Sequence, residues 1–240
     1  MEVYLTPDSE GIDIPDMVET YDGNSYANYT GTNPINVPSS VGTTEIKYVY
    51  YDSNGNPLAA SEVKNAGAYG VRAYITVTVN DGGTSKKYVI WQSEGETPPL
   101  HLYIQRRVVI LYSAFAEKTY SASDPSPLVA DWVYFRQAGT VYCSSAAHQG
   151  DANQAKSEIA KFYTTDTSSP YYLGLVDYSE SNHGNAGFVK DEFNHFTWEF
   201  AASAFRREQG TSVNLFTYSV PDSIGSNYYF KVCFGTLTVN

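Results

Sequence analysis

The sequence predicts an all-β protein built from two tandem sandwich domains, because strand-like runs separated by turn residues fill most of the chain. Its 240 residues suit two domains of this kind. Aromatic residues make up 15% of the chain, and 22 residues are tyrosines, which favour half-buried strands. Charged residues account for only 17%, too few for a coiled coil or a solvating tail. The composition therefore favours a secreted type of β protein.

The last two runs of the chain show the clearest alternation. Residues 215–220 and 228–239 alternate apolar with small polar residues, so each strand is expected to have one buried and one wetter face. Proline and glycine in the intervening segment, 221–225, supply a chain reversal. We expect the two runs to form the closing strand pair of a sandwich.

The first half contains strands with clear turn signals between them. A run at 44–51 precedes a turn of the Asn-Gly type at 52–57. A longer run at 69–79 places alternate apolar residues on one face. Glycines in the segment 80–83 then close a second hairpin. These segments predict one module made of strands and tight turns.

The boundary between the two modules is expected near Gln105. A run at 100–104 ends the first pattern, and a new pattern starts at Arg106. We therefore expect domains at 1–105 and 106–240, joined by almost no linker and so forming a stiff rod.

The second domain is expected to carry an insertion at about 140–186. Residues 151–163 are the one persuasive helix, which Asp151 is placed to cap and Gln154 to complete as a capping box. One side of this helix is apolar and can lie on the sandwich. Residues 171–178 predict an added strand, and the whole insertion is the best candidate for specific function. The apolar side consists of Ala152, Ala155, Ile159, Phe162 and Tyr163.

Short motifs occur in a specific order along the chain. The first module contains Asn65-Ala-Gly-Ala-Tyr69 before Val71-Arg-Ala73, and the second opens with Glu117-Lys-Thr-Tyr120 before Pro127-Leu128. These motifs resemble the immunoglobulin-like (MBG/Big-like) repeats of large surface proteins from gut Gram-positive bacteria. The remaining similar motifs are Gly187-Phe-Val189, Phe196-Thr-Trp-Glu-Phe200, Gly210-Thr-Ser-Val-Asn-Leu-Phe-Thr-Tyr218, Asn227-Tyr228 and Gly235-Thr-Leu-Thr-Val239.

The resemblance implies two tandem immunoglobulin-like sandwiches and a non-catalytic role as a stalk or adhesin module. It also implies an extracellular location on the bacterial cell surface, with a host or microbial surface glycan or protein as partner. Modules of this kind sometimes carry a Lys–Asn isopeptide crosslink, for which Lys118 and Asn240 are the conceivable pair. The opening motif of the family also accounts for Lys118 without a crosslink.

The sequence displays no motif for catalysis, a cofactor or a metal. Its four histidines lack the spacing of metal ligands, and no nucleophile elbow or papain-like cysteine context occurs. We therefore expect a protein that is not an enzyme. The net charge of −11 argues against a nucleic-acid partner, and no apolar run is long enough to span a bilayer. Residues 1–7 lack the features of a signal peptide, so Met1 is expected to be an artificial start or an internal boundary.

The two cysteines allow two interpretations. A disulfide between Cys143 and Cys233 would close a long loop and stabilise the fold by about 4 kcal/mol. Free cysteines also behave as small buried apolar residues, and this second interpretation is favoured.

Aromatic side chains provide the remaining signal for binding. Tyr171, Tyr172 and Tyr178 lie in the insertion, and Trp198 follows it in the sequence. Such rings stack on sugars or on protein partners, so the alternative function is a carbohydrate-binding module. A hydrolase accessory domain is a third hypothesis, and it requires acids or nucleophiles that the sequence does not display. For any single tyrosine, filling a pleated sheet is the favoured explanation.

Overall fold

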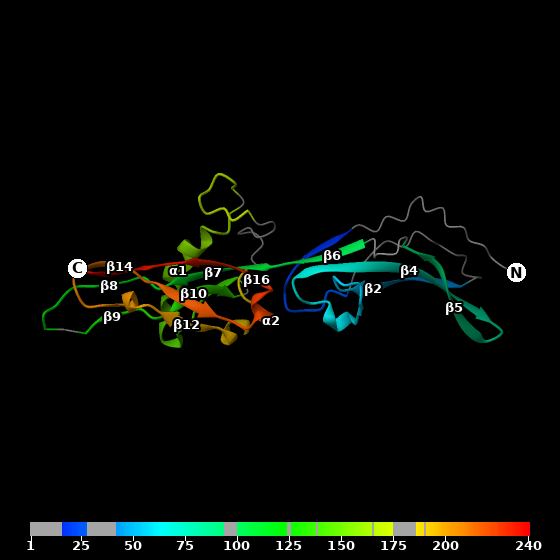
Figure 1. Cartoon of the computed structure of the whole chain (residues 1–240), viewed down its shortest axis with the longest axis horizontal. Coiled ribbons are helices and arrows are strands. Elements are labelled where there is room, and N and C mark those ends of the chain that lie inside the picture. Colours follow the sequence, from blue (N-terminus) through cyan, green and yellow to red (C-terminus); the bar gives the residue numbers. More distant parts are fainter. Residues whose placement is uncertain are drawn as a thin grey trace. The chain divides into compact units, whose positions relative to one another are not determined.

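The computed structural model has a mostly β fold, with 48% of residues in strands (Figure 1). The chain divides into two compact units, residues 1–105 and 106–240. The structure describes residues 16–27, 42–93, 100–123, 126–137, 139–164, 166–174, 186–189 and 191–240.

The described strands of the first unit form one six-stranded sheet around β4. Strand β2 pairs antiparallel along one edge of β4, while β6 and β5 follow one another along the opposite edge. Strand β1 adds to β6 in parallel. The elements are β1 (Met17–Thr20), β2 (Thr43–Tyr51), β3 (Pro57–Leu58), the 3₁₀ turn η1 (Ala60–Glu62), β4 (Gly67–Asp81), β5 (Thr84–Gln92) and β6 (Leu100–Gln105).

The buried face of this sheet follows the alternation in β4. Val71, Ala73 and Ile75 have no exposed surface, and the pattern predicted for this run is confirmed. Each fully buried valine or isoleucine contributes about 1.5–3 kcal/mol relative to an exposed one. Leu102 and Ile104 of β6 are buried in the same alternating way. The period of two therefore sets which face of the first unit becomes its core.

The turn between β2 and β3 is fixed by a single carboxylate. Asp52 Oδ1 accepts hydrogen bonds from the backbone N of Asn54 and of Asn56, both at 2.8 Å. Gly55 takes a φ of 81°, which glycine adopts without strain. The predicted Asn-Gly turn is confirmed, and the Asp52 oxygens are occupied in holding it.

The second unit contains several small sheets around a four-stranded one with the order β11-β10-β7-β16. The other sheets are β14-β17-β8, β12-β15 and β13-β9. The elements are β7 (Arg107–Ser113), β8 (Ala116–Lys118), β9 (Leu128–Val129), β10 (Val133–Gln137), β11 (Thr140–Cys143), η2 (Ala146–Asp151), α1 (Ala152–Ala160), η4 (Glu192–His195), β12 (Thr197–Phe200), η5 (Ala202–Ala204), β13 (Phe205–Arg206), β14 (Gly210–Val213), β15 (Phe216–Ser219), α2 (Asp222–Gly225), β16 (Tyr228–Cys233) and β17 (Thr236–Val239).

The four-stranded sheet is covered on both faces, because all five residues of β10 are buried. Tyr134 belongs to a cluster with Ala155 and Ile159 of α1. Its neighbour Phe135 contacts Trp198 of β12 instead. Successive side chains of a strand point to opposite faces, so α1 covers one face and the β12-β15 pair covers the other.

The predicted helix forms over Ala152–Ala160 and ends before residue 163, and its apolar residues Ala152, Ala155 and Ile159 are buried. Phe162 and Tyr163 follow the helix and are also buried. The predicted cap is wrong, because the Asp151 side chain makes no capping hydrogen bond. The 3₁₀ turn η2 runs directly into α1 and holds Asp151 in helical conformation, so its carboxylate contacts His148 instead. The strand predicted at 171–178 is absent over residues 171–174, and the rest of it lies outside the described residues.

The predicted closing strand pair is also wrong. Strand β15 pairs with β12, whereas β16 lies parallel to β7. The run 228–239 divides at Gly235, after which β17 joins a different sheet with β14 and β8. A Cβ on Gly235 would lie 2.4 Å from the carbonyl oxygen of Ala114, so only glycine allows this change of sheet. The described residues thus show a mostly β chain with several small mixed sheets, and the tandem-sandwich arrangement stays a prediction.

Candidate functional site

The residues predicted to form an aromatic platform do not share one surface. Trp198 stacks on Phe196 at 5.6 Å and packs in the layer of β12 and β15. Tyr171 contacts the edge of Phe162 at 5.1 Å, next to α1. Because α1 and β12 cover opposite faces of the four-stranded sheet, the sheet separates Trp198 from Tyr171. Tyr178 lies outside the described residues.

Tyr171 itself remains an accessible ring. It is 38% exposed, and the Lys161 ammonium lies 5.9 Å from the ring centroid. The backbone N of Tyr172 donates to the Ser169 carbonyl at 3.0 Å, which shapes the loop that presents both tyrosines. Asp166 Oδ1 accepts from the Ser168 backbone N and hydroxyl at 2.9 and 2.7 Å. These local bonds give Tyr171 a defined surface position beside a cation.

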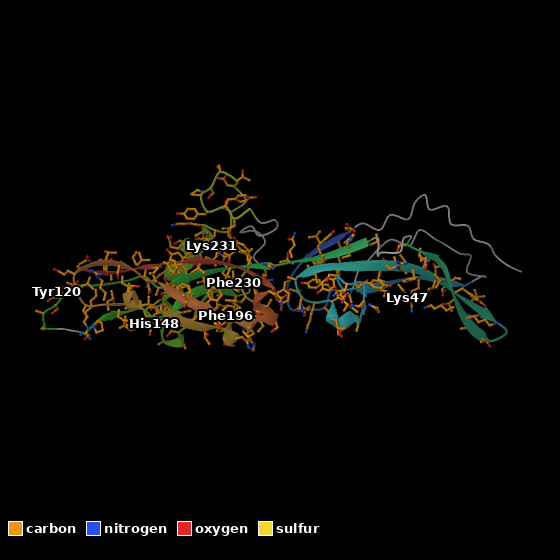
Figure 2. The ribbon with its side chains drawn as sticks, in the orientation of Figure 1. Lys47, Tyr120, His148, Phe196, Phe230 and Lys231 are labelled. Carbon is orange, nitrogen blue, oxygen red and sulfur yellow. The ribbon has the colours of Figure 1, made fainter. Side chains whose placement is uncertain are left out.

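The layer around Trp198 is packed as a core. Phe188 meets Phe196 at 4.9 Å, and Phe196 meets Phe230 at 5.4 Å, both edge to face. Tyr218 lies 5.2 Å from Phe230. Figure 2 shows Phe196 and Phe230 in this layer. Such aromatic pairs contribute about 0.5–1.5 kcal/mol beyond their burial, so the rings stabilise the unit.

The same pair of strands forms an open pocket of about 440 Å³ at its end. Phe216 is buried and forms part of the lining, while Leu215 is 44% exposed. Phe200 is the cross-strand partner of Phe216, with ring centroids 5.7 Å apart. Glu199 is the one charged lining residue. The pocket suits an apolar group that carries a positive charge at one end. Its lining consists of Glu199, Phe200, Ala201, Leu215, Phe216 and Thr217.

Sequence patterns do not reveal this pocket, because its two sides are distant in sequence. Apolar alternation identifies Phe200 and Phe216 as strand residues. It does not identify which strands pair. The cross-strand register of β12 and β15 is what brings the two rings together.

A buried polar cluster joins three segments of the second unit. Asn214 Nδ2 donates to the carbonyl oxygens of Ala114 and Ala130, both at 2.8 Å. The Ser113 hydroxyl donates to the Asn214 carbonyl at 2.6 Å and accepts from the Gly235 backbone N at 2.9 Å. Asn214 and Ser113 have no exposed surface. These side chains satisfy backbone groups where the sheets meet, so their role is structural.

Cys143 and Cys233 are free thiols. Burial raises the pKa of each to about 11. Both thiols therefore stay protonated near neutral pH and are poor nucleophiles. Cys143 lies in the core cluster below α1, and Cys233 packs against that cluster. The structure shows two small apolar side chains and no disulfide.

Lys118 lies in β8 and Asn240 directly follows β17, but their side chains point apart. The parallel register of β8 and β17 pairs Val239 with Lys118, which places Asn240 on the opposite face. Asn240 Nδ2 donates to the Glu117 carboxylate, and Lys118 Nζ donates to the Ser126 carbonyl at 3.0 Å. This geometry does not place the Lys118 amine beside the Asn240 amide, as an isopeptide crosslink requires.

His148 forms a close contact at the start of the helical segment. Its ring stacks on Trp132 with centroids 3.6 Å apart, and its Nδ1 lies 3.1 Å from Asp151 Oδ2. Trp132 belongs to the core cluster, so the stacked pair anchors η2 to the sheet. Among the described residues, no group of three or more His, Cys, Asp or Glu side chains is arranged to hold a metal ion.

Comparisons with known proteins identify no relative. No family model matches the sequence, and neither a curated protein nor a solved structure matches it. In the part of the chain that the structure describes, no helix is long and apolar enough to cross a membrane. The resemblance to immunoglobulin-like surface repeats therefore stays a prediction.

Proposed function

We propose that the chain is a non-catalytic fragment of an extracellular bacterial surface protein, in which β-rich modules act as a stalk or adhesin. The finer architecture of this proposal is a tandem pair of immunoglobulin-like sandwiches. The mostly β fold and the extensive aromatic packing of the second unit support it. The observation that carries it is the strand order at the two ends of the second unit.

The first strands of this unit pair in parallel with its last strands. Strand β7 pairs with β16 over six residues, and β8 pairs with β17 over three. Tension applied to the two ends of the unit pulls β7 and β8 towards their amino ends and β16 and β17 towards their carboxyl ends. Because the paired strands are parallel, they slide along one another under shear. The bonds of each ladder then carry the load together, whereas peeling breaks them one at a time. This arrangement suits a module that transmits force.

Single-molecule pulling tests the stalk proposal. We expect the second unit to resist a much higher force when held at Arg106 and Asn240 than when held at Arg106 and Ser226. Arg106 and Ser226 flank the paired residues Arg107 and Tyr228 at one end of the β7-β16 ladder, so the second geometry peels that ladder. All three anchor positions are exposed. Equal forces in both geometries would contradict the proposal.

The proposed partners are glycans or proteins of host or microbial surfaces. A fluorescently labelled second unit should bind to such surfaces in a saturable way, and an unlabelled copy should compete. A measurable hydrolytic activity of the purified chain would instead favour the hydrolase hypothesis.

Carbohydrate binding is the second candidate function, and the exposed ring of Tyr171 beside Lys161 favours it. Soluble polysaccharides should then bind the protein, and Tyr171→Ala should weaken binding about fivefold or more, since stacking of a sugar on one ring is worth about 1 kcal/mol or more. Trp198→Phe is the matched control and should leave binding unchanged, because Trp198 lies on the other side of the sheet. If the protein binds no glycan of host or plant origin, carbohydrate binding is excluded.

A further inference from the structure

Strand β5 differs from its neighbours in the first unit because its described side chains are all exposed. Tyr88 is 50% exposed and Val89 is 59% exposed. These two residues are adjacent, so they point to opposite faces of the strand. Val77 of β4, the cross-strand partner of Tyr88, is buried. Strand β5 thus presents apolar side chains on both faces.

The outer edge of β5 is also open in the part of the chain that the structure describes. There, β4 is the sole strand with which β5 pairs. A strand paired on one side has alternate N–H and C=O groups pointing outward, and these can bond an added strand. Nine residues form β5, and its register with β4 is regular from Thr84 to Val89, beyond which it shifts. The regular stretch is long enough for several such bonds.

An adjacent part of the same sheet edge already accepts a strand. Strands β5 and β6 lie along the same edge of β4, and β6 pairs in parallel with β1. The Asp16 carboxylate extends this contact by accepting a hydrogen bond from the His101 backbone N at 2.8 Å. A strand is therefore already added on this side of the sheet, at β6.

The charges of β5 define the chemistry of an added strand. Lys86 and Lys87 are its only charged residues, within a chain of net charge −11. Lys87 already bonds the Glu45 carboxylate on one face of the sheet, so carboxylates are suitable neighbours there. Pairing of two β5 strands in parallel would place lysines beside lysines, which disfavours that form of self-association.

We propose that the outer edge of β5 is a docking site for an extended acidic segment of a partner protein, which adds to the sheet as a strand. Backbone hydrogen bonds supply affinity that depends little on sequence, and carboxylates beside Lys86 and Lys87 supply selectivity. Apolar residues of the segment pack on Tyr88 and Val89. This inference is independent of the stalk proposal.

The probe is a labelled nine-residue peptide of alternating valine and threonine with a glutamate near each end. A second peptide carries lysines in place of the glutamates. Fluorescence anisotropy with the full chain should show saturable binding of the acidic peptide, at least tenfold tighter than that of the basic one. Amide exchange should show new protection at about every second residue of β5 on binding, because only outward-facing amides gain partners. Equal binding of both peptides would overturn the proposal.

Variants locate the site. Lys86→Glu should weaken the acidic peptide about tenfold and strengthen the basic one. Lys64→Glu is the matched control, since Lys64 is exposed in the same unit but lies outside β5, and it should change neither affinity by more than about twofold. If both variants lose binding of the acidic peptide, the effect is one of general charge, and the proposal is overturned. New protection elsewhere than in β5, binding that appears only after removal of residues 1–15, or a dimer that forms without peptide would each overturn the proposal.

Discussion

Strands β10 of the second unit and β5 of the first unit are opposites in burial, although both combine aromatic, β-branched and cationic residues. All five residues of β10 are buried, including Arg136, which is 1% exposed. The described side chains of β5 are all exposed. The difference comes from what covers each strand: α1 and the β12-β15 layer enclose β10, whereas β5 pairs within the described residues only with β4. Residue type alone therefore does not identify the core of this protein.

The largest expected effect separates the two strands directly. Phe135→Ala in β10 should destabilise the second unit by about 3–5 kcal/mol, because a fully buried ring leaves a cavity within a close-packed layer. Tyr88→Ala in β5 should change stability by no more than about 0.5 kcal/mol, as is usual for an exposed position. Chemical denaturation of both variants measures the contrast. Similar losses for the two would show that β5 is also covered.

Part of this contrast could be predicted from the sequence. The period of two in β4 correctly identified Val71, Ala73 and Ile75 as core, and the apolar stripe of residues 152–163 correctly placed the helix on the sheet. Both patterns are local, and local periodicity reports which side of an element is buried. The coverage of β10 on both faces depends on non-local pairing, so no local pattern reports it.

The predictions of a closing strand pair and of an aromatic platform failed for the same reason. The run 228–239 alternates as one strand. In the structure, however, Gly235 packs closely against the carbonyl oxygens of Ser113 and Ala114, and the run is divided there between two sheets. Trp198 and Tyr171 are near in sequence, yet the sheet lies between them, so that Trp198 packs half-buried in the aromatic layer of β12 and β15 while Tyr171 lies at the surface beside α1. Tertiary contacts with distant segments decided both outcomes, as they did for the pocket beside Phe216.

The next effect tests how the sheets around β10 are joined. Asn214→Ala should cost about 2 kcal/mol or more, because it leaves the buried carbonyl oxygens of Ala114 and Ala130 without their side-chain donor. Thermal or denaturant unfolding measures the loss. Asn24→Ala, in an exposed turn of the first unit, is the control and should be nearly neutral. A neutral result for Asn214→Ala would mean that water replaces the amide there.

A smaller effect concerns the change of sheet at Gly235. Gly235→Ala should destabilise the second unit by about 1–3 kcal/mol, because the added methyl group would overlap two carbonyl oxygens. Gly150→Ala is a matched control on the same unit, since nothing lies within 4 Å of its Cβ position. That control should be neutral or stabilising by up to about 1 kcal/mol. Equal losses for the two variants would contradict the close approach seen at Gly235.

The smallest effect is a pH dependence of the stability of the second unit, which comes from its two cysteines. Burial raises the pKa of Cys143 and Cys233 from 9.0 to about 11, so the folded thiols keep protons that the unfolded chain releases. Their contribution to stability is complete below pH 9 and is lost as the pH rises towards about 11. Unfolding at a series of pH values should show this decline, and replacing both cysteines by alanine should reduce its slope. An unchanged slope would mean that other groups cause the decline.

Hydrogen exchange of the free protein tests most directly whether packing, and not residue type, distinguishes β10 from β5. The hydrogen-bonded amides of β10 should exchange only through global unfolding of the second unit, while about every second amide of β5 should exchange rapidly. Uniform slow exchange along β5, equal to that of β10, would contradict this expectation.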